Sequence, residues 1–80
     1  MPDKMADKVL DARNLSCPLP ILKTKRALGG VSIGGTLEVL ATDPGSLDDF
    51  VAFAESTGNT LMEHSKDETG VFRFLLRREA

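Results

Sequence analysis

Hydrophobic and polar residues alternate with a period of two along several short stretches of this chain. The clearest is Thr36–Thr42, in which Leu37, Val39 and Ala41 share one side. Such alternation is typical of a strand with one buried face. Similar patterns, bounded by turn residues, predict three further strands, at residues 8–12, 59–65 and 71–78.

Two other stretches have the spacing of amphipathic helices. The first helix is expected from Pro18 to about Leu28, because Gly29-Gly30 is a strong C-terminal signal. The second is expected to be capped by residues 43–46 and to end at Thr57-Gly58. Its predicted core stripe has the spacing i, i+3, i+4 and i+7 and comprises Leu47, Phe50, Val51 and Ala54.

The predicted elements follow the order β-α-β-α-β-β. A five-residue turn, residues 66–70, joins the last two strands, which should therefore form an antiparallel hairpin. The first two strands are joined through a helix and should be parallel, with a right-handed crossover. The predicted fold class is α+β, a two-layer α/β sandwich in which both helices cover one face of a four-stranded mixed sheet.

The chain has 80 residues, of which 41% are hydrophobic, and this is enough for a single core. We expect residues 1–7 to be a flexible N-terminal lead and residues 8–80 to be one domain. No apolar run approaches the roughly 20 residues of a membrane helix, and the polar start lacks a hydrophobic signal region. We therefore expect a cytoplasmic protein without a membrane partner.

Charge is unevenly distributed along the chain. The net charge of −2 gives no general reason to expect nucleic acid as a partner. Between residues 12 and 37, however, there is no acidic residue, whereas Arg13, Lys23, Lys25 and Arg26 all lie there. The half of the chain that contains the only cysteine is therefore locally basic.

That cysteine, Cys17, directly precedes the first predicted helix in the sequence Cys17-Pro18-Leu19-Pro20. One thiol can form neither an internal disulfide nor a cysteine-based metal site, and we expect no metal and no cofactor. Because Pro18 disfavours helical dihedrals at Cys17, we expect Cys17 to be the N-cap and Pro18 the first helical residue. The N–H of Leu19 would then be the free donor nearest to the sulfur.

A helix N-terminus carries roughly half a positive charge, which stabilises an anion. We therefore expect the pKa of Cys17 to be lowered, with Lys23, Lys25 and Arg26 adding positive charge nearby. This arrangement predicts a reactive sulfur near the surface. The alternative is a buried structural cysteine, since free cysteines are often buried.

Beside the thiol, the helix has a second face. Leu19, Leu22, Lys23 and Arg26 lie largely opposite the predicted core residues, which are Ile21, Thr24 and Leu28. Leu22, Lys23 and Arg26 are one candidate for a partner-docking patch. The alternative is that Leu22 tucks into the flank of the core and the charges are simply solvated.

His64 is the only histidine and a conceivable partner for the thiol. It lies in the third predicted strand, on the side of Thr60 and Met62, and we interpret it as an ordinary strand residue. Asp11 and Asp43 lie at strand ends and can approach the site, although Asp43 also suits a helix cap.

The Cys17-Pro18-Leu19-Pro20 motif resembles that of the TusA-like sulfur carriers, also called the SirA-like family. The likeness continues through most of the chain, at residues 10–15, 43–44, 49–50, 57–58, 61 and 70–77. The resemblance implies that Cys17 accepts sulfane sulfur from a cysteine desulfurase or a rhodanese. It also implies that Cys17 holds this sulfur as a persulfide and passes it to a downstream acceptor protein.

By the same resemblance, Pro18, Leu19 and Pro20 support the helix N-terminus beside the sulfur. The implied destinations are tRNA thiolation, molybdenum cofactor synthesis and sulfur oxidation. The implied role is that of a sulfurtransferase-type carrier rather than a free-standing catalyst. The implied sandwich also resembles the C-terminal domain of the third bacterial translation initiation factor.

Two other function classes are compatible with the residues. An RNA-binding or regulatory protein-interaction module would use the basic patch, but that patch is small and lacks aromatic residues, so direct nucleic-acid binding is not expected. A thiol peroxidase or redox sensor would need an external thiol, because the chain has no resolving cysteine.

Overall fold

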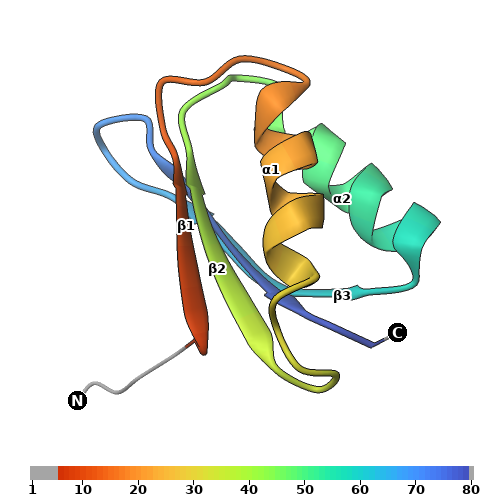
Figure 1. Cartoon of the computed structure of the whole chain (residues 1–80). Helices are drawn as coiled ribbons and strands as arrows, with labels where there is room; N and C mark the ends of the chain where they lie inside the picture. Colours follow the sequence, from red (N-terminus) through yellow and green to blue (C-terminus); the bar gives the residue numbers. More distant parts are fainter. Residues whose placement is uncertain (1–5, 80) are drawn as a thin grey trace.

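The computed structural model describes residues 6–79. Its elements follow the predicted order (Figure 1) and are β1 (Lys8–Ala12), α1 (Leu19–Leu28), β2 (Thr36–Ala41), α2 (Ser46–Thr57), β3 (Thr60–Lys66) and β4 (Phe72–Arg77). Each predicted boundary lies within about a residue of the observed one. None of the helices within residues 6–79 combines the length and the apolar composition that a membrane crossing requires.

The four strands form one mixed sheet in the order β1-β2-β4-β3. β1 and β2 are parallel, whereas β4 is antiparallel to both β2 and β3. Both helices pack on the same face of the sheet, with α1 against β1 and β2, and α2 against β3 and β4 (Figure 1). The predicted α+β two-layer fold is confirmed, and β1 and β3 are its edge strands.

The core lies between the helices and the inward-facing residues of the two central strands. Leu37, Val39 and Ala41 of β2 are fully buried, as their alternation predicted. Phe74 of β4 stacks on Phe50 of α2, with ring centroids 4.3 Å apart and planes 12° from parallel. This aromatic pair joins the second helix to the centre of the sheet, because both rings are fully buried.

The core stripe of α2 differs in part from the prediction. Phe50 and Ala54 are buried, and Leu47 packs partly against the core, but Val51 is 40% exposed. In its place Phe53 is buried and makes an edge-on contact with the Phe50 ring. Helical spacing predicts that a stripe exists, whereas its exact centre depends on how the helix is rotated against the sheet.

A β-bulge in β3 changes the orientation of the only histidine. The register with β4 shifts between Leu61 and Glu63, so Met62 is an extra residue in the strand. His64 consequently pairs with Phe74 on the helix-covered side of the sheet, whereas Thr60 pairs with Arg77. The prediction that His64 shares a side with Thr60 is therefore wrong.

Contacts near both ends of the described chain join the residues that flank β1 and β4 to the rest of the fold. The Arg78 guanidinium donates hydrogen bonds to the carbonyl oxygens of Leu28, the last residue of α1, and of Val31, at 3.3 and 2.8 Å. Asp7 donates its N–H to the carbonyl of Thr36 at 3.1 Å, so pairing with β2 extends to Asp7. Residues 1–5 of the predicted lead lie outside the described residues.

Two buried hydroxyl groups provide a test of the packing. Thr24 Oγ1 donates to the carbonyl of Pro20 at 2.7 Å, whereas Ser46 Oγ has no hydrogen-bond partner within residues 6–79. We expect Thr24→Val to lower the free energy of unfolding by about 1 kcal/mol, and Ser46→Ala to leave it unchanged or raise it by about 1 kcal/mol. Urea unfolding curves measure both changes, and an equal loss in Ser46→Ala would contradict the unpaired hydroxyl.

Candidate functional site

Cys17 lies in the loop between β1 and α1. Because β1 and β2 are parallel, the segments that follow them lie at the same edge of the sheet, at the top of Figure 1. The segment after β2 contains Asp43 and leads into the first turn of α2. In α/β folds, the carboxyl ends of parallel strands are where ligands commonly bind.

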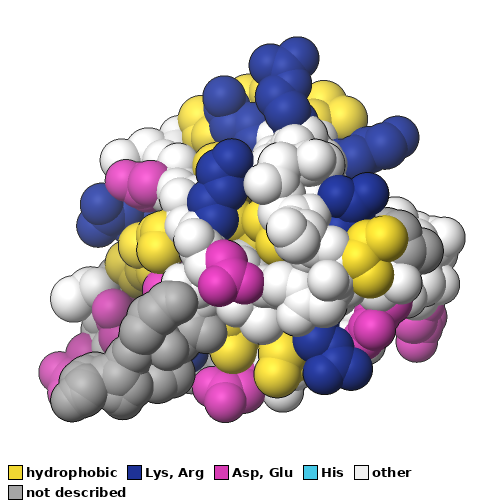
Figure 2. Space-filling view, turned by 60° about the horizontal axis from the view of Figure 1, so that its bottom comes forward, with side chains coloured by type: hydrophobic (Ala, Val, Ile, Leu, Met, Phe, Trp, Pro, Cys, Tyr) yellow, Lys and Arg dark blue, Asp and Glu magenta, His cyan; other side chains and the backbone are white. Residues whose placement is uncertain are grey.

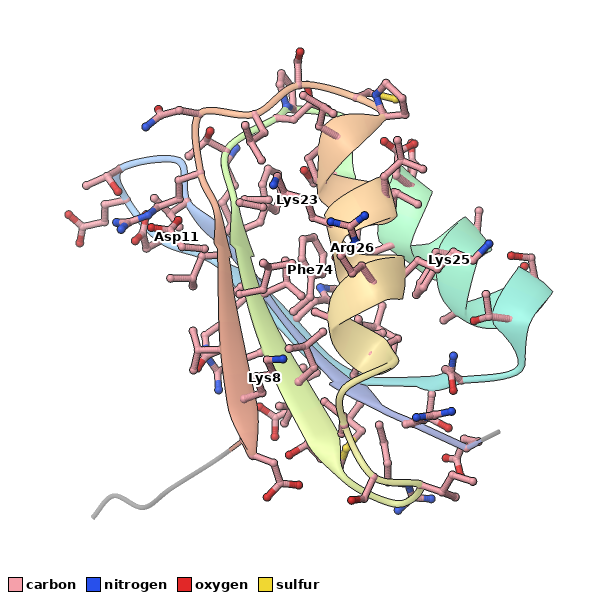
Figure 3. The ribbon with its side chains drawn as sticks, in the orientation of Figure 1. Lys8, Asp11, Lys23, Lys25, Arg26 and Phe74 are labelled. Atoms are coloured by element: carbon pink, nitrogen blue, oxygen red, sulfur yellow. The ribbon has the colours of Figure 1, made fainter. Side chains whose placement is uncertain are left out.

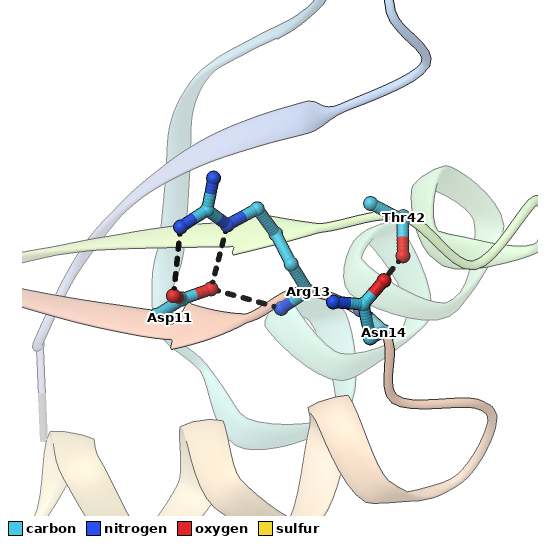
Figure 4. Close-up of polar contacts among 4 residues, drawn as sticks. All are labelled: Asp11, Arg13, Asn14 and Thr42. Carbon is cyan, nitrogen blue, oxygen red and sulfur yellow. Dashed lines mark hydrogen bonds and ion pairs between the residues drawn. The ribbon is translucent and has the colours of Figure 1, made fainter.

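Polar contacts hold the start of the Cys17 loop (Figure 4). Asp11 accepts two hydrogen bonds from the Arg13 side chain, both at 2.9 Å, and one from the Arg13 backbone N–H at 3.1 Å. Asn14 has a φ of 69°, a region that asparagine tolerates better than most residues. Its N–H donates to Thr42 Oγ1 at 2.9 Å, which links the loop to the end of β2.

Asp11 therefore belongs to the turn and is paired with Arg13. The side-chain hydrogen bond from Arg13 is the main reason why the pKa of Asp11 falls to about 2. A carboxylate held this way stays charged in mild acid, so the turn keeps its bonds at low pH.

The start of α1 differs from the prediction by one residue. The helix begins at Leu19 and Pro18 is the N-cap, and no side chain within residues 6–79 caps the helix. Cys17 lies one residue before the cap, and the Cys17–Pro18 peptide bond is cis. The N–H of Leu19 is not free, because it donates to the carbonyl of Ser16 at 2.9 Å and closes a turn ahead of the helix.

Cys17 is exposed to solvent. The alternative of a buried structural cysteine is therefore excluded. The loop presents the thiol at the surface, where a partner protein can reach it.

The predicted lowering of the thiol pKa is wrong, and the reason lies in α2. The negative charge of Asp49 is the largest cause of a raised pKa for Cys17, followed by partial desolvation, a hydrogen bond with Asp49 and the charge of Asp43. The two carboxylates converge near Gly45, where an added Cβ would lie 3.3 Å from Asp43 Oδ2 and 3.9 Å from Asp49 Oδ2. Negative charge beside a thiol disfavours the thiolate.

The sequence analysis missed Asp49 as a site residue, although it considered Asp43. A signal was available in the predicted parallel pairing, because the loop after the first strand and the helix after the second must then be neighbours. The prediction instead counted only charges close to Cys17 in the sequence.

A groove separates α1 from β1 and has a volume of about 620 Å³. We call it the α1–β1 groove, and its lining residues are Lys8, Leu10, Leu19, Leu22, Lys23, Arg26 and Ala27. The predicted docking residues Leu22, Lys23 and Arg26 all line it. Leu22 is 55% exposed and does not tuck into the flank of the core.

The figures show the basic side chains around this groove. Lys8 and Lys23 reach into the space between β1 and α1, with Arg26 beside them, whereas Lys25 lies on the other side of α1 (Figure 3). In the space-filling view, Lys and Arg side chains gather over one part of the surface with hydrophobic side chains between them (Figure 2).

The remaining candidate, His64, lies far from the thiol in the topology. It is on β3, the edge strand opposite β1, and it lines a separate shallow pocket beside α2. This agrees with its interpretation as a strand residue. Within residues 6–79, no group of three or more His, Cys, Asp or Glu side chains is arranged to hold a metal ion.

The sequence has recognisable relatives. The family model described as "Sulfurtransferase TusA" matches residues 8–78. The chain is 57% identical over 72 residues to the sulfur carrier protein TusA of Allochromatium vinosum, covering 90% of this chain and 93% of that protein. It is 42% identical over 73 residues to the putative sulfur carrier protein YrkI of Bacillus subtilis, covering 91% and 96%.

A solved structure also resembles this one. The crystal structure of a SirA-like protein from Desulfitobacterium hafniense superposes with a TM-score of 0.79 and 26% sequence identity. The match covers 91% of this chain and 99% of the other. The likeness therefore extends over most of the fold.

Removing the charge of Asp49 tests the electrostatics of the thiol. We expect Asp49→Asn to lower the pKa of Cys17, so that iodoacetamide alkylates the thiol several-fold faster at neutral pH, because the thiolate is the nucleophile. The measurement is the alkylation rate as a function of pH. Asp48→Asn is the matched control, because Asp48 is an exposed acid in the same helical turn and is not among the causes of the raised thiol pKa. Equal rates in the two variants would contradict the assignment.

Proposed function

Because the chain belongs to the TusA family of sulfur carriers, we propose that Cys17 is the residue on which the sulfur is carried. The observation that supports this most directly is that the only cysteine of the chain is exposed. A carrier needs a side chain that forms and breaks a bond to sulfane sulfur reversibly, and a thiol does this by exchange at sulfur.

The proposed loading step balances without an added oxidant. The thiolate of Cys17 attacks the terminal sulfur of a persulfide on the donor, a new S–S bond forms at Cys17, and the donor cysteine leaves as a thiolate. The proposed donor is a cysteine desulfurase or a rhodanese. Unloading is the same exchange in the other direction, toward the thiol of a downstream acceptor protein.

The protein acts between donor and acceptor proteins, as its family implies. We propose the cytoplasm as its location, and tRNA thiolation, molybdenum cofactor synthesis or sulfur oxidation as the receiving pathway. Residues 8–80 would form a single carrier domain. Because each cycle returns Cys17 to its starting state, the protein works as a relay for its partners.

The surroundings of Cys17 suit this role. Pro18 is the N-cap of α1, Leu19 is its first residue, and Pro20 is buried in its first turn. The loop that carries Cys17 therefore ends at a fixed helix start. Asp49 on α2 and Asp43 in the segment before it favour the protonated thiol in the free protein. Since the thiolate is the form that oxidises readily, the resting carrier is protected until a partner binds.

We propose that partners dock on the exposed face of α1, with Leu22, Lys23 and Arg26 as contact residues. All three lie within about three turns of the thiol along the helix and line the α1–β1 groove. A basic face beside the sulfur attracts an acidic partner surface and raises the rate of encounter.

Replacing the thiol tests the carrier site. Cys17→Ser should fold as the parent does, because the residue is exposed and makes no capping hydrogen bond, and such changes usually alter stability by about 0.5 kcal/mol or less. With a cysteine desulfurase and cysteine, the parent should gain the mass of one sulfur atom, lost on reduction, and the variant should gain none. Sulfur on the variant would refute the role of Cys17, and an oxygen adduct on the parent would indicate a redox sensor.

Charge reversal tests the docking face. We expect Lys23→Glu to slow sulfur loading at low salt by roughly tenfold and to have little effect at high salt, because steering by exposed charges is screened. Lys25→Glu is the matched control: Lys25 is exposed on the same helix but lies outside the groove. Loading rates at two salt concentrations make the comparison. Identical rates for the two variants would mean that partners dock elsewhere.

A further inference from the structure

The α1–β1 groove has two walls, and the sequence predicted only the wall formed by α1. Lys8 and Leu10 come from β1 and face residues of α1 across the groove. Its floor is apolar, because Leu10 and Ala27 line it together with Leu19 and Leu22, both of which are largely exposed. Clustered exposed apolar side chains of this kind commonly mark a binding surface.

The charges of the groove all have one sign. Its charged lining residues are Lys8, Lys23 and Arg26, and no acidic side chain among residues 6–79 lines it. Figure 3 shows these three side chains around the space between α1 and β1. An occupant that satisfies both the floor and the rim must carry aliphatic groups and negative charges together.

The groove has a direction and a length. It begins at Leu19, two residues after Cys17, and follows α1 to Ala27, a distance of about 12 Å at 1.5 Å per residue. At the far end, Lys8 Nζ lies 3.1 Å from the position of a Cβ added to Gly30. A segment of about eight helical residues or four extended residues would fill this length.

We infer that the α1–β1 groove binds an acidic, leucine-bearing segment of the protein that exchanges sulfur with Cys17. The inference rests on the proposed function, because the occupant is identified as part of a sulfur-transfer partner. Aliphatic side chains of the segment pack between Leu10, Leu19 and Leu22, while its carboxylates meet the basic rim. Binding there holds the partner beside the thiol without covering it.

Two other occupants fit the surface less well. Nucleic acid would match the basic rim, but the described lining residues include no aromatic side chain on which bases could stack. A second copy of this chain fits better than nucleic acid, because the outer face of α2 carries acidic and apolar side chains together. These are Asp48, Val51 and Glu55, which are exposed and have helical spacing. That contact would be head to tail, so it would propagate from copy to copy rather than close as a dimer.

The experiment measures binding of a synthetic peptide to the full-length Cys17→Ser protein, so no sulfur chemistry is involved. The probe is a dye-labelled peptide of twelve residues with Leu at helical spacing and Glu at most other positions. Its controls have Lys in place of Glu, or Ser in place of Leu. We expect only the Glu/Leu peptide to change in fluorescence anisotropy, with binding that weakens as salt rises.

Matched substitutions locate the binding site. Lys8→Glu and Leu22→Ser should each weaken binding by about tenfold, the loss typical of a contributing interface residue. Lys25→Glu and Ile33→Ser are the controls, because both residues are exposed and lie outside the groove. Equal losses in controls and groove variants, or equal binding of the Lys peptide, would overturn the inference.

Competition links the groove to function. In the parent protein, the Glu/Leu peptide should slow sulfur loading, and the Lys peptide should not. Sedimentation of the parent at increasing concentration tests the competitor: self-association that Lys8→Glu abolishes would assign the groove to a second copy and overturn the inference. The two proposals fail separately, because anisotropy on Cys17→Ser does not involve the thiol and the mass test does not involve the groove.

Discussion

The parallel pairing of β1 with β2 sets the position of every part of the site. Its register aligns Ala12 with Ala41, so the two strands end together. The loop that carries Cys17 and the segment that carries Asp43 therefore leave the sheet side by side, and α2 starts next to the thiol. The same pairing requires a crossover helix, and α1 is that helix. One backbone arrangement thus creates the thiol site, its acidic neighbours and one wall of the groove.

The thiol consequently lies between two surfaces of opposite charge. Asp49 and Asp43 face it from α2 and its preceding loop, whereas Lys23 and Arg26 turn toward β1 and line the groove. The two sets of charges have different roles in our proposal: the acids favour the protonated thiol, and the bases attract a partner. A partner that brings a cation next to these acids would lower the pKa of Cys17, so that the thiolate would form only on docking.

The groove exists because β1 is an edge strand. In the order β1-β2-β4-β3, α1 packs across β1 and β2, and no further strand within the described residues 6–79 covers the outer side of β1. In the part of the chain that the structure describes, Lys8 and Leu10 therefore lie beside α1 without another helix or strand above them. Edge strands are usually protected by charge or by covering segments, and here Lys8 provides charge at the rim.

Short-range patterns in the sequence determined the elements, their order and much of the core. Alternation identified Leu37, Val39 and Ala41 as buried because side chains in a strand point to alternate faces whatever the strand packs against. Tertiary structure alone decided how α2 is rotated against the sheet and whether the pKa of Cys17 is raised or lowered. It also decided the position of the bulge at Met62, after which the residues of β3 face the opposite side of the sheet from the one predicted. These depend on groups distant in the sequence: the electric field at a thiol sums all nearby charges, and Asp49 becomes a neighbour only once β1 and β2 have paired.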